Sequence, residues 1–478
     1  MKMRFGSQGG DPIGRARRIA SVVHMIPTLA NSPRLKIAVI GSGVSGLSAA
    51  WLLSRAHQVV LYEQADRAGG HTNTVDVEID GSTIPVDTGF IVFNRVTYPN
   101  LTALFEHLQV PTQLSDMSFA ASLDSGGLEY AGGSGFGGLF AQKSNLLRPR
   151  FLSMLAGVRK FYRNAVSDAN APRFEEMTLG EYLNAGDYSD AFRDDHLLPM
   201  ASAIWSAKKA EMLSYPALAF IRFHANHGLL QIAQRPVWET VTGGSSTYVR
   251  RLLGDFSGEI RLGMAVLRID RDADGVTLHD ARGGAQRFDH VVIASHANQA
   301  LAMLAEPTAG EAALLGSFRY QRNHAVLHSD VSFMPRRRPA WACWNYIGGS
   351  EHDGADACFT YWMNRLQNLP GKTPFFVTLN PQRTVLPDAL HYSTIYDHPL
   401  FDSAAIAAQA RLWELQGQRR TWFCGAYFGA GFHEDGLQAG LAVAEELGGV
   451  QRPWTVADPS GRIAFKPRLR AELAELVA

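Results

Sequence analysis

The stretch RLKIAVIGSGVSGLSAAWLLSRAHQVVLYEQ, residues 34–64, decides the fold of this chain. Its apolar run over residues 35–40 predicts a buried strand, residues 47–55 predict a helix, and residues 58–62 predict a second strand. Two strands joined through a helix form a βαβ unit, in which the strands run parallel. The sequence therefore predicts an α/β fold built on a parallel sheet.

The turn between the first predicted strand and the helix reads GSGVSG, residues 41–46. Gly41 suits a tight turn, Gly43 lets the backbone approach a pyrophosphate, and Gly46 allows the helix to pack closely on the strand. Val44 and Ser45 lie between them, where a helix N-terminus presents N–H groups to an anion. A glycine turn also occurs in proteins that bind no nucleotide, but the strand, turn and helix follow here in the order of a dinucleotide site.

An acidic residue ends the second predicted strand. Glu63, followed by Gln64, is placed to accept hydrogen bonds from the hydroxyls of an adenosine ribose. A carboxylate at this position disfavours a ribose that carries a 2′-phosphate. The expected ligand is therefore an adenine dinucleotide without that phosphate.

The composition of the whole chain narrows the class of protein. The 478 residues are long for one domain, and the 45 Lys and Arg balance the 45 Asp and Glu, so no basic excess indicates a nucleic-acid partner. Three cysteines fit a reducing cytoplasm better than a disulfide framework. No apolar run reaches the roughly 18 residues needed to span a bilayer. Residues 1–33 lack a signal-peptide core, and we expect them to be a disordered extension.

Strand-rich segments alternate with two insertions along the chain. A helical pattern dominates from about residue 145 to 230, and the segment 305–415 is mixed. We expect one nucleotide-binding domain assembled from residues 34–99, 231–304 and 416–450. We expect a second domain built from residues 100–230 and 305–415, and a C-terminal tail over residues 451–478.

Five motifs in order extend the evidence along the chain. They read YEQADRAGGHTNTV (62–75), VDTGFIVF (86–93), VTGGSSTYVRRL (241–252), IRLGMAVLRI (260–269) and FDHVVIASHANQAL (288–301). Together they resemble the superfamily of flavin amine oxidases, phytoene desaturases and protoporphyrinogen oxidases. The resemblance implies a Rossmann-like FAD-binding domain of the amine-oxidase type, an inserted mixed α+β substrate domain, and non-covalently bound FAD.

The resemblance also implies which residues contact the cofactor. They are Gly41, Gly43, Val44, Ser45, Gly46, Glu63, Gln64, Arg67, Gly69, Gly70, His71, Thr88, Gly89, Phe90, Val266, Gly425, Ala426, Gly436 and Leu437. Two positions depart from the superfamily pattern. His71 stands where an Arg usually follows the glycine pair, and Ala426 stands where an Asp usually meets the ribityl chain. Glu434 or Asp435 could take over that ribityl contact.

Four shorter motifs suggest a closer resemblance. They are GGHTNTV, TGFIVFN, TYPNL and FHEDGL, and they resemble predicted FAD-binding proteins associated with cyclopropane-fatty-acid-synthase-like methyltransferases, which include the desaturase of furan fatty acid biosynthesis. This resemblance implies an unsaturated or methyl-branched acyl chain as substrate and a lipid methyltransferase as partner. An amine oxidase, a flavin-dependent isomerase and a non-catalytic FAD-bound partner remain alternatives. The absence of Lys between Lys209 and Lys372 weakens the first of these.

The candidate catalytic residues come from the C-terminal stretch TWFCGAYFGAGFHEDGLQAGLAVAEEL, residues 421–447, which predicts a strand over 421–424 and a helix over 437–447. His433 has the ordinary pKa best matched to a base near neutral pH. Glu434 and Asp435 are its ionisable neighbours, and Tyr346 is a further pocket candidate. The alternative is that the trio caps the helix and orders the cofactor. The pair His224 and His227 has no obvious third ligand, so no metal site is expected.

Two stretches combine basic and apolar residues. SNLLRPRFLSMLAGVRKFYRNAV, residues 144–166, predicts an amphipathic helix, and FMPRRRPAWACWNY, residues 333–346, places three arginines beside tryptophans. The apolar stripe of the helix comprises Phe151, Met154, Leu155, Val158, Phe161 and Tyr162. Such stretches favour peripheral contact with the inner face of the cytoplasmic membrane. The alternative for the helix is that this stripe faces the protein core.

Overall fold

The computed structural model of the chain describes residues 34–133, 135–168, 171–174, 176–205, 208–226, 228–230, 236–349 and 358–466. The predicted disordered extension, residues 1–33, lies outside the described residues, as do residues 467–478 of the predicted tail. The described residues from Lys36 onward form one compact unit.

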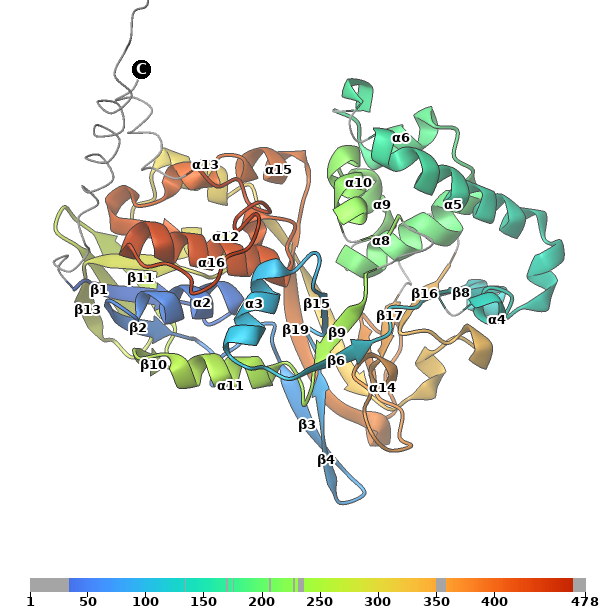
Figure 1. Cartoon of the computed structure of the whole chain (residues 1–478), viewed down its shortest axis with the longest axis horizontal. Helices are drawn as coiled ribbons and strands as arrows, with labels where there is room; N and C mark the ends of the chain where they lie inside the picture. The colour runs from blue at the N-terminus through green and yellow to red at the C-terminus, as the bar shows by residue number, and fades with distance from the viewer. Residues whose placement is uncertain are drawn as a thin grey trace, which may run out of the picture. The chain divides into compact units, whose positions relative to one another are not determined.

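A parallel sheet of five strands forms the nucleotide-binding part (Figure 1). Its order is β10 (Glu259–Arg261), β2 (Gln58–Tyr62), β1 (Lys36–Ile40), β14 (His290–Ile293) and β20 (Thr421–Phe423), and neighbouring strands are parallel. The central strands are apolar runs because helices and loops bury both faces of such a sheet. This sheet draws its strands from all three segments that the sequence assigned to one domain.

Two helices, α2 (Val44–Leu53) and α16 (His433–Gly448), lie side by side beside this sheet (Figure 1). A side chain on Gly436 would meet Ser45 Oγ at 2.8 Å, and one on Gly440 would collide with the carbonyl oxygen of Ser45. The two glycines therefore let the helix backbones approach closely. Both helices begin earlier than the predicted residues 47 and 437, because the glycine-rich turns already contain their first helical residues.

Smaller sheets flank the parallel sheet. The hairpin β3 (Thr74–Ile79) and β4 (Ser82–Asp87) turns at Asp80–Gly81, and both turn residues have positive φ. The strands β5 (Val92–Asn94), β9 (Trp238–Val241) and β6 (Thr112–Ser115) form one sheet, and β11 (Val266–Arg271), β12 (Val276–Asp280) and β13 (Ala285–Phe288) form another.

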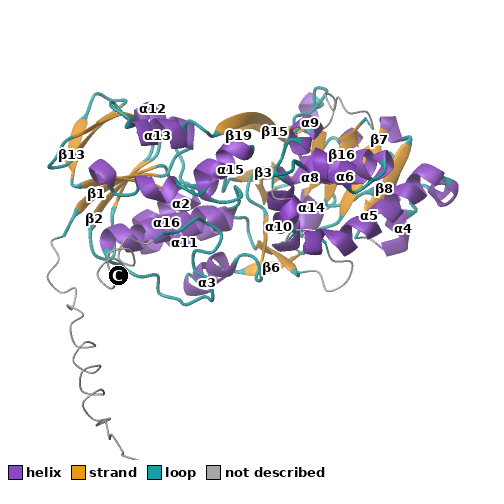
Figure 2. Ribbon diagram, turned by 90° about the horizontal axis from the view of Figure 1, so that it is seen from above, coloured by secondary structure: helices purple, strands orange, loops and turns teal. Residues whose placement is uncertain are grey.

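A seven-stranded sheet forms the framework of the second part of the described chain (Figure 2). Its order is β19 (Leu390–Leu400), β15 (Arg319–His328), β18 (Phe376–Leu379), β17 (Cys358–Trp362), β16 (Trp344–Gly348), β7 (Phe119–Leu123) and β8 (Leu128–Gly132). Residues from both predicted insertions pair here, since β16 lies parallel to β7. The residue boundaries between the two domains stay a prediction.

Helices fill the region between residues 145 and 230, in agreement with the periodicity of the sequence. They are α5 (Pro149–Asp168), α6 (Leu179–Ala185), α7 (Asp190–Phe192), α8 (Leu198–Trp205), α9 (Lys209–Leu213) and α10 (Ala217–Asn226). The other helices of the described chain are α3 (Pro99–His107), α4 (Gly135–Leu139), α11 (Ser246–Asp255), α12 (Ala297–Met303), α13 (Ala309–Leu315), α14 (Met363–Leu366) and α15 (Ser403–Gln409). None of the described helices combines the length and apolar character needed to cross a bilayer.

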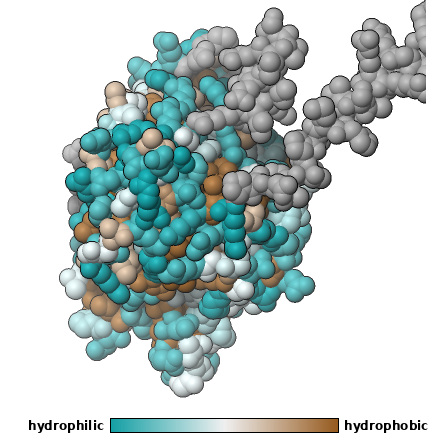
Figure 3. Space-filling model, turned by 90° about the vertical axis from the view of Figure 1, so that its left-hand side faces the viewer, coloured by the Kyte–Doolittle hydropathy of each residue, from teal (hydrophilic) through white to brown (hydrophobic). Residues whose placement is uncertain are grey.

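Apolar side chains of the seven-stranded sheet and α5 share one core. It includes Phe151 and Met154 of α5 together with Tyr130, Tyr346 and Phe359 of the strands. On the side of the molecule shown in Figure 3, hydrophilic side chains predominate and apolar ones are interspersed among them.

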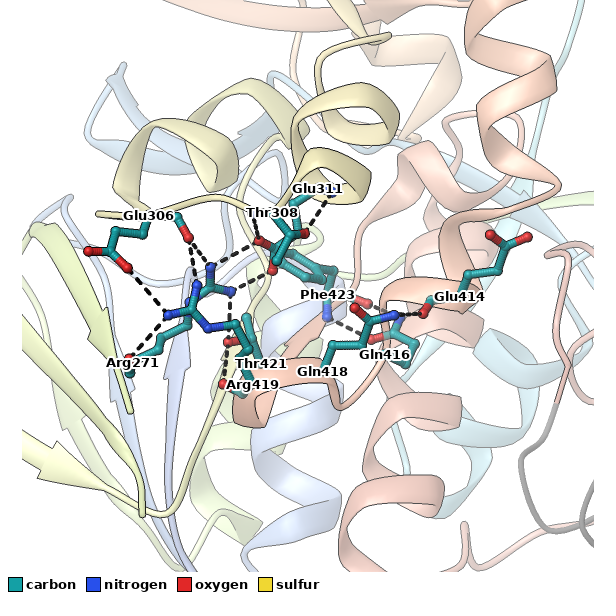
Figure 4. Close-up of polar contacts among 10 residues, drawn as sticks. All are labelled: Arg271, Glu306, Thr308, Glu311, Glu414, Gln416, Gln418, Arg419, Thr421 and Phe423. Atoms are coloured by element: carbon teal, nitrogen blue, oxygen red, sulfur yellow. Dashed lines mark hydrogen bonds and ion pairs between the residues drawn. The ribbon is translucent and has the colours of Figure 1, made fainter. Parts of the chain in front are cut away.

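A buried ion pair joins β11 to α13 (Figure 4). Arg271 donates from Nη2 to Glu311 Oε2 at 2.9 Å and to the carbonyl oxygen of Glu306 at 2.6 Å, and the side chains of Arg271 and Glu311 are each only 1% exposed. Glu311 also accepts from the backbone N–H of Thr308, at the N-terminus of α13. Arg271 further donates to Thr421 at the start of β20, so one guanidinium connects three elements.

Candidate functional site

The carboxyl ends of the parallel strands gather the predicted cofactor residues. Gly41 follows β1, Glu63 follows β2, His296 lies just after β14, and Gly425 lies just after β20. In open parallel sheets, ligands bind in the crevice outside this edge. The sheet therefore brings residues from positions 41 to 425 of the chain to one edge.

Protein atoms crowd one side of the first glycine turn, and the other side has room for a ligand. Gly41 has φ +96° and donates its N–H to the carbonyl oxygen of Tyr62 at 2.8 Å, and a side chain on Gly46 would collide with the carbonyl oxygen of Gly41. Gly43 differs, because a side chain there would meet no protein atom within 4 Å. An extended group can therefore pass over Gly43, as a pyrophosphate requires.

Glu63 ties this turn to the segment that follows β2. One carboxylate oxygen, Oε2, accepts from Ser42 N at 2.8 Å and Ser42 Oγ at 2.6 Å, and Oε1 accepts from Ala65 N at 2.9 Å. Gln64 beside it is exposed. The chain leading to Val266 runs alongside, since Met264 donates its N–H to the carbonyl oxygen of Glu63 at 2.8 Å.

The second glycine loop packs directly on the first. A side chain on Gly70 would lie 3.0 Å from the Cα of Gly43, and Gly69 donates its N–H to the carbonyl oxygen of Ser42 at 3.0 Å. Arg67 donates to the carbonyl oxygens of Gly70 at 2.9 Å and Thr72 at 3.2 Å. Arg67 thus fixes the shape of the loop and places a positive charge beside it.

Four segments meet at the side chain of His433. Its ring stacks on Phe90 with centroids 3.9 Å apart, and its Nε2 lies 2.6 Å from the hydroxyl of Tyr248 and 3.3 Å from that of Thr72. The hydroxyls of Thr72 and Tyr248 are themselves 2.6 Å apart. This cluster joins the second glycine loop, the VDTGFIVF segment, α11 and the first turn of α16. Sequence reasoning missed Thr72 and Tyr248, although both lie within quoted motifs.

The expected match of His433 to neutral pH is wrong. Burial lowers its pKa to about 3, because the cationic imidazole would lose its hydration. His433 is therefore neutral at physiological pH. At that pH the imidazole can donate or accept a hydrogen bond, but it does not carry the second proton of a cationic imidazole.

A second group of rings surrounds His71. The ring stacks on Tyr396 with centroids 4.9 Å apart, and the centroids of His398 and His296 lie 5.5 Å and 6.1 Å away. Burial lowers the pKa of His71 well below its ordinary value and that of His398 to about 4. His71 thus supplies no fixed positive charge in place of the usual Arg. Its Nε2 is buried and has no hydrogen-bond partner within the described chain.

The VDTGFIVF segment runs beside both loops. Phe90 donates its N–H to the carbonyl oxygen of His71 at 2.8 Å, and a side chain on Gly89 would collide with that same oxygen. The hydroxyl of Thr88 lies 2.9 Å from that of Tyr396, which belongs to β19 of the seven-stranded sheet. The contact joins the cofactor segments to the second sheet.

Asp87 is a buried hub that the list of predicted site residues lacked. Its carboxylate accepts from Ser245 N and Oγ, from Thr74 Oγ1 at 2.5 Å and from Gln367 Nε2 at 2.8 Å. Burial nevertheless raises its pKa to about 6. Asp87 holds together three quoted motifs, at residues 62–75, 86–93 and 241–252. The sequence signal for it was an acidic residue at the end of β4.

The C-terminal glycine loop differs in detail from expectation. Gly436 donates its N–H to the carbonyl oxygen of Phe432 at 3.1 Å, and Leu437 is fully buried within α16. The N–H groups without an intrahelical acceptor belong to the first turn, which begins at His433. Next to Gly425 and Ala426, the buried hydroxyl of Tyr427 has no hydrogen-bond partner among the described residues.

Glu434 and Asp435 occupy capping positions. Glu434 is fully buried and accepts from the N–H groups of Asn100 at 3.0 Å and Leu101 at 2.9 Å, which lie in the first turn of α3. Asp435 accepts from Phe432 N at 2.7 Å and pairs with Arg462 at 2.6 Å. These contacts favour the capping alternative, and a contact of either carboxylate with a ribityl chain stays a prediction.

Tyr346 lies apart from these clusters, on β16. It is fully buried in the core of the seven-stranded sheet, 5.6 Å from the ring of Phe359, and Lys209 Nζ lies 5.4 Å from its ring centroid. His224 is also buried, with Nδ1 2.8 Å from the carbonyl oxygen of Phe220, and His227 lies outside the described residues. Within the described chain, no three His, Cys, Asp or Glu residues gather as metal ligands.

The donor set fits FAD. Open space over Gly43, a carboxylate at Glu63, and the unpaired polar atoms of His71 and Tyr427 lie along one edge of the sheet. Cys424 is fully buried, and burial raises the pKa of its thiol, so this thiol is poorly suited to a covalent flavin bond. The structure thus provides groups suited to a non-covalent dinucleotide.

Comparisons with known proteins agree with this geometry. The family model described as flavin containing amine oxidoreductase matches residues 44–365. A Mycobacterium tuberculosis protein assigned as the flavin-containing monoamine oxidase AofH is 24% identical over 351 residues, which cover 71% of this chain and 73% of the relative.

Two solved structures share the fold at low sequence identity. The cyclohexylamine oxidase of Brevibacterium oxydans IH-35A has a TM-score of 0.63 and 18% identity, covering 87% of this chain and 100% of its own. A CLA-producing fatty acid isomerase from P. acnes has a TM-score of 0.62 and 15% identity, covering 86% of this chain and 98% of its own.

Proposed function

The chain belongs to the family of flavin-containing amine oxidoreductases and is an FAD-dependent oxidoreductase, and from this premise we propose that it removes hydrogen from an unsaturated or methyl-branched fatty acyl chain. The acyl chain is carried by a phospholipid. A C–H bond next to a double bond is the one broken, because the adjacent π-system stabilises the charge that develops on carbon.

The neutrality of the imidazoles in the candidate site is the observation that carries this proposal. The imidazoles of His71, His398 and His433 have pKa values lowered by burial, and the rings around them are those of Tyr396 and Phe90. The nearby carboxylate of Glu434 already accepts hydrogen bonds from the protein, and that of Asp435 already pairs with Arg462. A neutral, aromatic surrounding suits an uncharged hydrocarbon chain better than a cationic amine.

Bound FAD supplies the hydride acceptor for such a reaction, while the protein supplies binding and orientation. The backbone from Gly41 to Gly46 and the loop fixed by Arg67 would hold the pyrophosphate, and Glu63 the ribose. The free N–H groups in the first turn of α16 would stabilise negative charge on the flavin ring. His433 acts as a positioning residue, because its neutral ring fixes Phe90 and Tyr248 in place.

A lipid methyltransferase fits this proposal as a partner. An enzyme that methylates an unsaturated acyl chain generates the methyl-branched substrate, and both enzymes then act on the same phospholipid. This partnership rests on the resemblance of the GGHTNTV and FHEDGL motifs.

Amine oxidation is a second candidate function, because the M. tuberculosis relative is assigned as a monoamine oxidase. The absence of Lys between Lys209 and Lys372 counts against it, since amine oxidases commonly place a lysine near the flavin. The two functions differ in which substrate reduces the cofactor.

Anaerobic mixing distinguishes them. The FAD-loaded protein is mixed with phospholipids that carry unsaturated or methyl-branched acyl chains, and the flavin absorbance is followed over time. Bleaching with these lipids, but not with fully saturated phospholipid, supports the desaturase. Bleaching only with polyamines or aromatic amines supports an amine oxidase instead. If the lipid changes without net bleaching, the enzyme is an isomerase, and if every lipid leaves both colour and lipid unchanged, the proposal fails.

A further inference from the structure

Three leucines protrude near the start of α5. The side chain of Leu147 is 87% exposed, that of Leu146 is 52% exposed and that of Leu152 is 48% exposed. Leu147 is the most exposed large hydrophobic residue of the described chain. Exposed leucines that lie close together are unusual on a soluble surface and indicate a binding surface.

These leucines are not the apolar stripe that the sequence predicted to contact lipid. Phe151, Met154 and Phe161 of that stripe are fully buried, and the ring of Phe161 packs 5.6 Å from that of Phe192. The stripe is therefore core, as in the alternative interpretation of the helix. The exposed apolar residues come from the preceding turn and from the opposite face of α5.

The arginine stretch lies against the same region. Arg148 donates to the carbonyl oxygen of Gly127 at 2.5 Å, and Arg337 donates to that of Gly126 at 2.9 Å. Both acceptors belong to the turn between β7 and β8. Figures 1 and 2 place β8, α4 and α5 side by side. Two stretches almost 200 residues apart thus form one surface, which we name the Leu147 surface and define by Lys143, Leu146, Leu147, Arg148, Leu152 and Arg336.

The charge around this surface is strongly positive. Residues 143–167 contain six Lys and Arg and no Asp or Glu, and residues 331–349 contain three Arg and no acid. Glu129 and Asp195 are buried and each neutralises one arginine, Arg337 and Arg150. The carboxylate of Asp124, in the turn between β7 and β8, is exposed. The nine cations of the two segments outnumber these three carboxylates, so the surface keeps a net positive charge that attracts an anionic partner.

We propose that the Leu147 surface docks on an anionic phospholipid bilayer. Exposed leucines insert at the boundary between headgroups and acyl chains, and the surrounding cations contact lipid phosphates. The chemistry of an anionic bilayer matches both features at once, whereas a folded protein partner would also need polar complementarity. The proposal goes beyond the reaction proposed above, because binding to the bilayer does not depend on which acyl chain reacts.

The test is co-sedimentation of the full-length, FAD-loaded protein with vesicles. We expect binding to vesicles that contain phosphatidylglycerol, weaker binding to pure phosphatidylcholine, and weaker binding at high salt. The double variant Leu146→Ser/Leu147→Ser is expected to lower the partition coefficient by at least about tenfold. The double variant Lys143→Gln/Arg336→Gln is expected to lower it roughly tenfold or more on anionic vesicles only.

Matched controls use residues elsewhere on the surface. Leu267→Ser replaces another exposed leucine, on β11, and Arg282→Gln replaces an exposed arginine in the turn before β13. Neither control should change vesicle binding, and all variants should keep the flavin absorbance of the native protein. The proposal is overturned if the native protein does not bind anionic vesicles, or if the controls and the Leu147 variants lose binding equally. It is also overturned if the native protein is an oligomer that the leucine variant dissociates.

Discussion

The hydroxyl of Tyr248 lies 2.6 Å from Nε2 of His433, and this contact joins two residues 185 positions apart in the chain. Tyr248 extends from α11 and His433 from the first turn of α16. Tyr248 is buried and His433 is half-buried, and Phe90 stacks on the imidazole from a third segment. The contact therefore fixes the elements that border the proposed flavin position.

Removing the Tyr248 hydroxyl should loosen this arrangement. The Tyr248→Phe variant leaves His433 Nε2 with only the longer contact to Thr72, and we expect a loss of about 1–2 kcal/mol in the free energy of unfolding. Flavin should also dissociate faster, as measured by the recovery of free-flavin fluorescence. Tyr130→Phe removes a buried hydroxyl on β8 that donates to Asp195, and it serves as the control. Equal effects on flavin release in both variants would contradict a specific role for Tyr248.

A side chain at Gly43 should expel the cofactor and leave the fold intact. Nothing in the protein lies within 4 Å of the added Cβ, and the φ of −64° at Gly43 suits alanine. We expect Gly43→Ala to be purified largely without flavin, with a thermal midpoint equal to that of the native protein stripped of FAD. Gly254→Ala in α11 also meets open space and should retain FAD. Full flavin occupancy in the Gly43 variant would place the pyrophosphate elsewhere.

The buried histidines make stability depend on pH. Burial lowers the pKa of His398 to about 4, whereas the unfolded chain titrates near 6.5. Between pH 6.5 and pH 4 this histidine is protonated in the unfolded state but not in the folded state. The free energy of unfolding therefore falls as the pH drops from 6.5 to 4. The His398→Asn variant retains an acceptor for Asn323 and should lose about 3 kcal/mol less over this window. Urea unfolding at several pH values measures the difference, with His324→Gln as an exposed control. Identical pH slopes in native protein and variant would refute this.

The Arg271–Glu311 pair should be costly to break from one side. Arg271→Leu leaves a buried carboxylate without its cation, and we expect a loss of about 3–5 kcal/mol in the free energy of unfolding. The double variant Arg271→Leu/Glu311→Leu removes both charges and should be more stable than the single variant. Chemical denaturation of the native protein, the two single variants Arg271→Leu and Glu311→Leu, and the double variant measures the coupling free energy between the two residues. A double variant that loses the sum of both single effects would show that the pair does not interact.

A substitution at Glu434 distinguishes a structural role of this residue from a catalytic one. Its carboxylate accepts N–H groups at the start of α3, and the Glu434→Gln variant would turn an amide NH₂ towards one of those donors. We expect a loss of about 1–3 kcal/mol in stability and a rate of flavin reduction, per folded molecule, that changes by less than about twofold. A fall of a hundredfold or more in that rate, with stability unchanged, would make Glu434 the base.

Much of the nucleotide-binding part could be predicted from the sequence because its signals are local. The strand β2 has the predicted bounds, and β1 and β2 are parallel as the βαβ unit predicted. Helix starts were predicted too late in α2 and α16, because a glycine turn and the first helical turn share residues. The role of Gly436 was likewise hidden, since a glycine that serves helix packing looks the same as one that passes a ligand.

The sequence by itself determined the βαβ unit and the dinucleotide loop, because each depends on spacing within a few dozen residues, and the family, because five motifs follow one another in order along the chain. Only the tertiary structure decided which side chains meet. It placed Thr72, Phe90, Tyr248 and His433 in one cluster, where desolvation lowers the pKa of His433 to about 3 and leaves its imidazole neutral. It also turned the apolar stripe of α5 into core and exposed Leu147 instead. Burial and long-range contacts set pKa values and surfaces, and neither is encoded in local spacing.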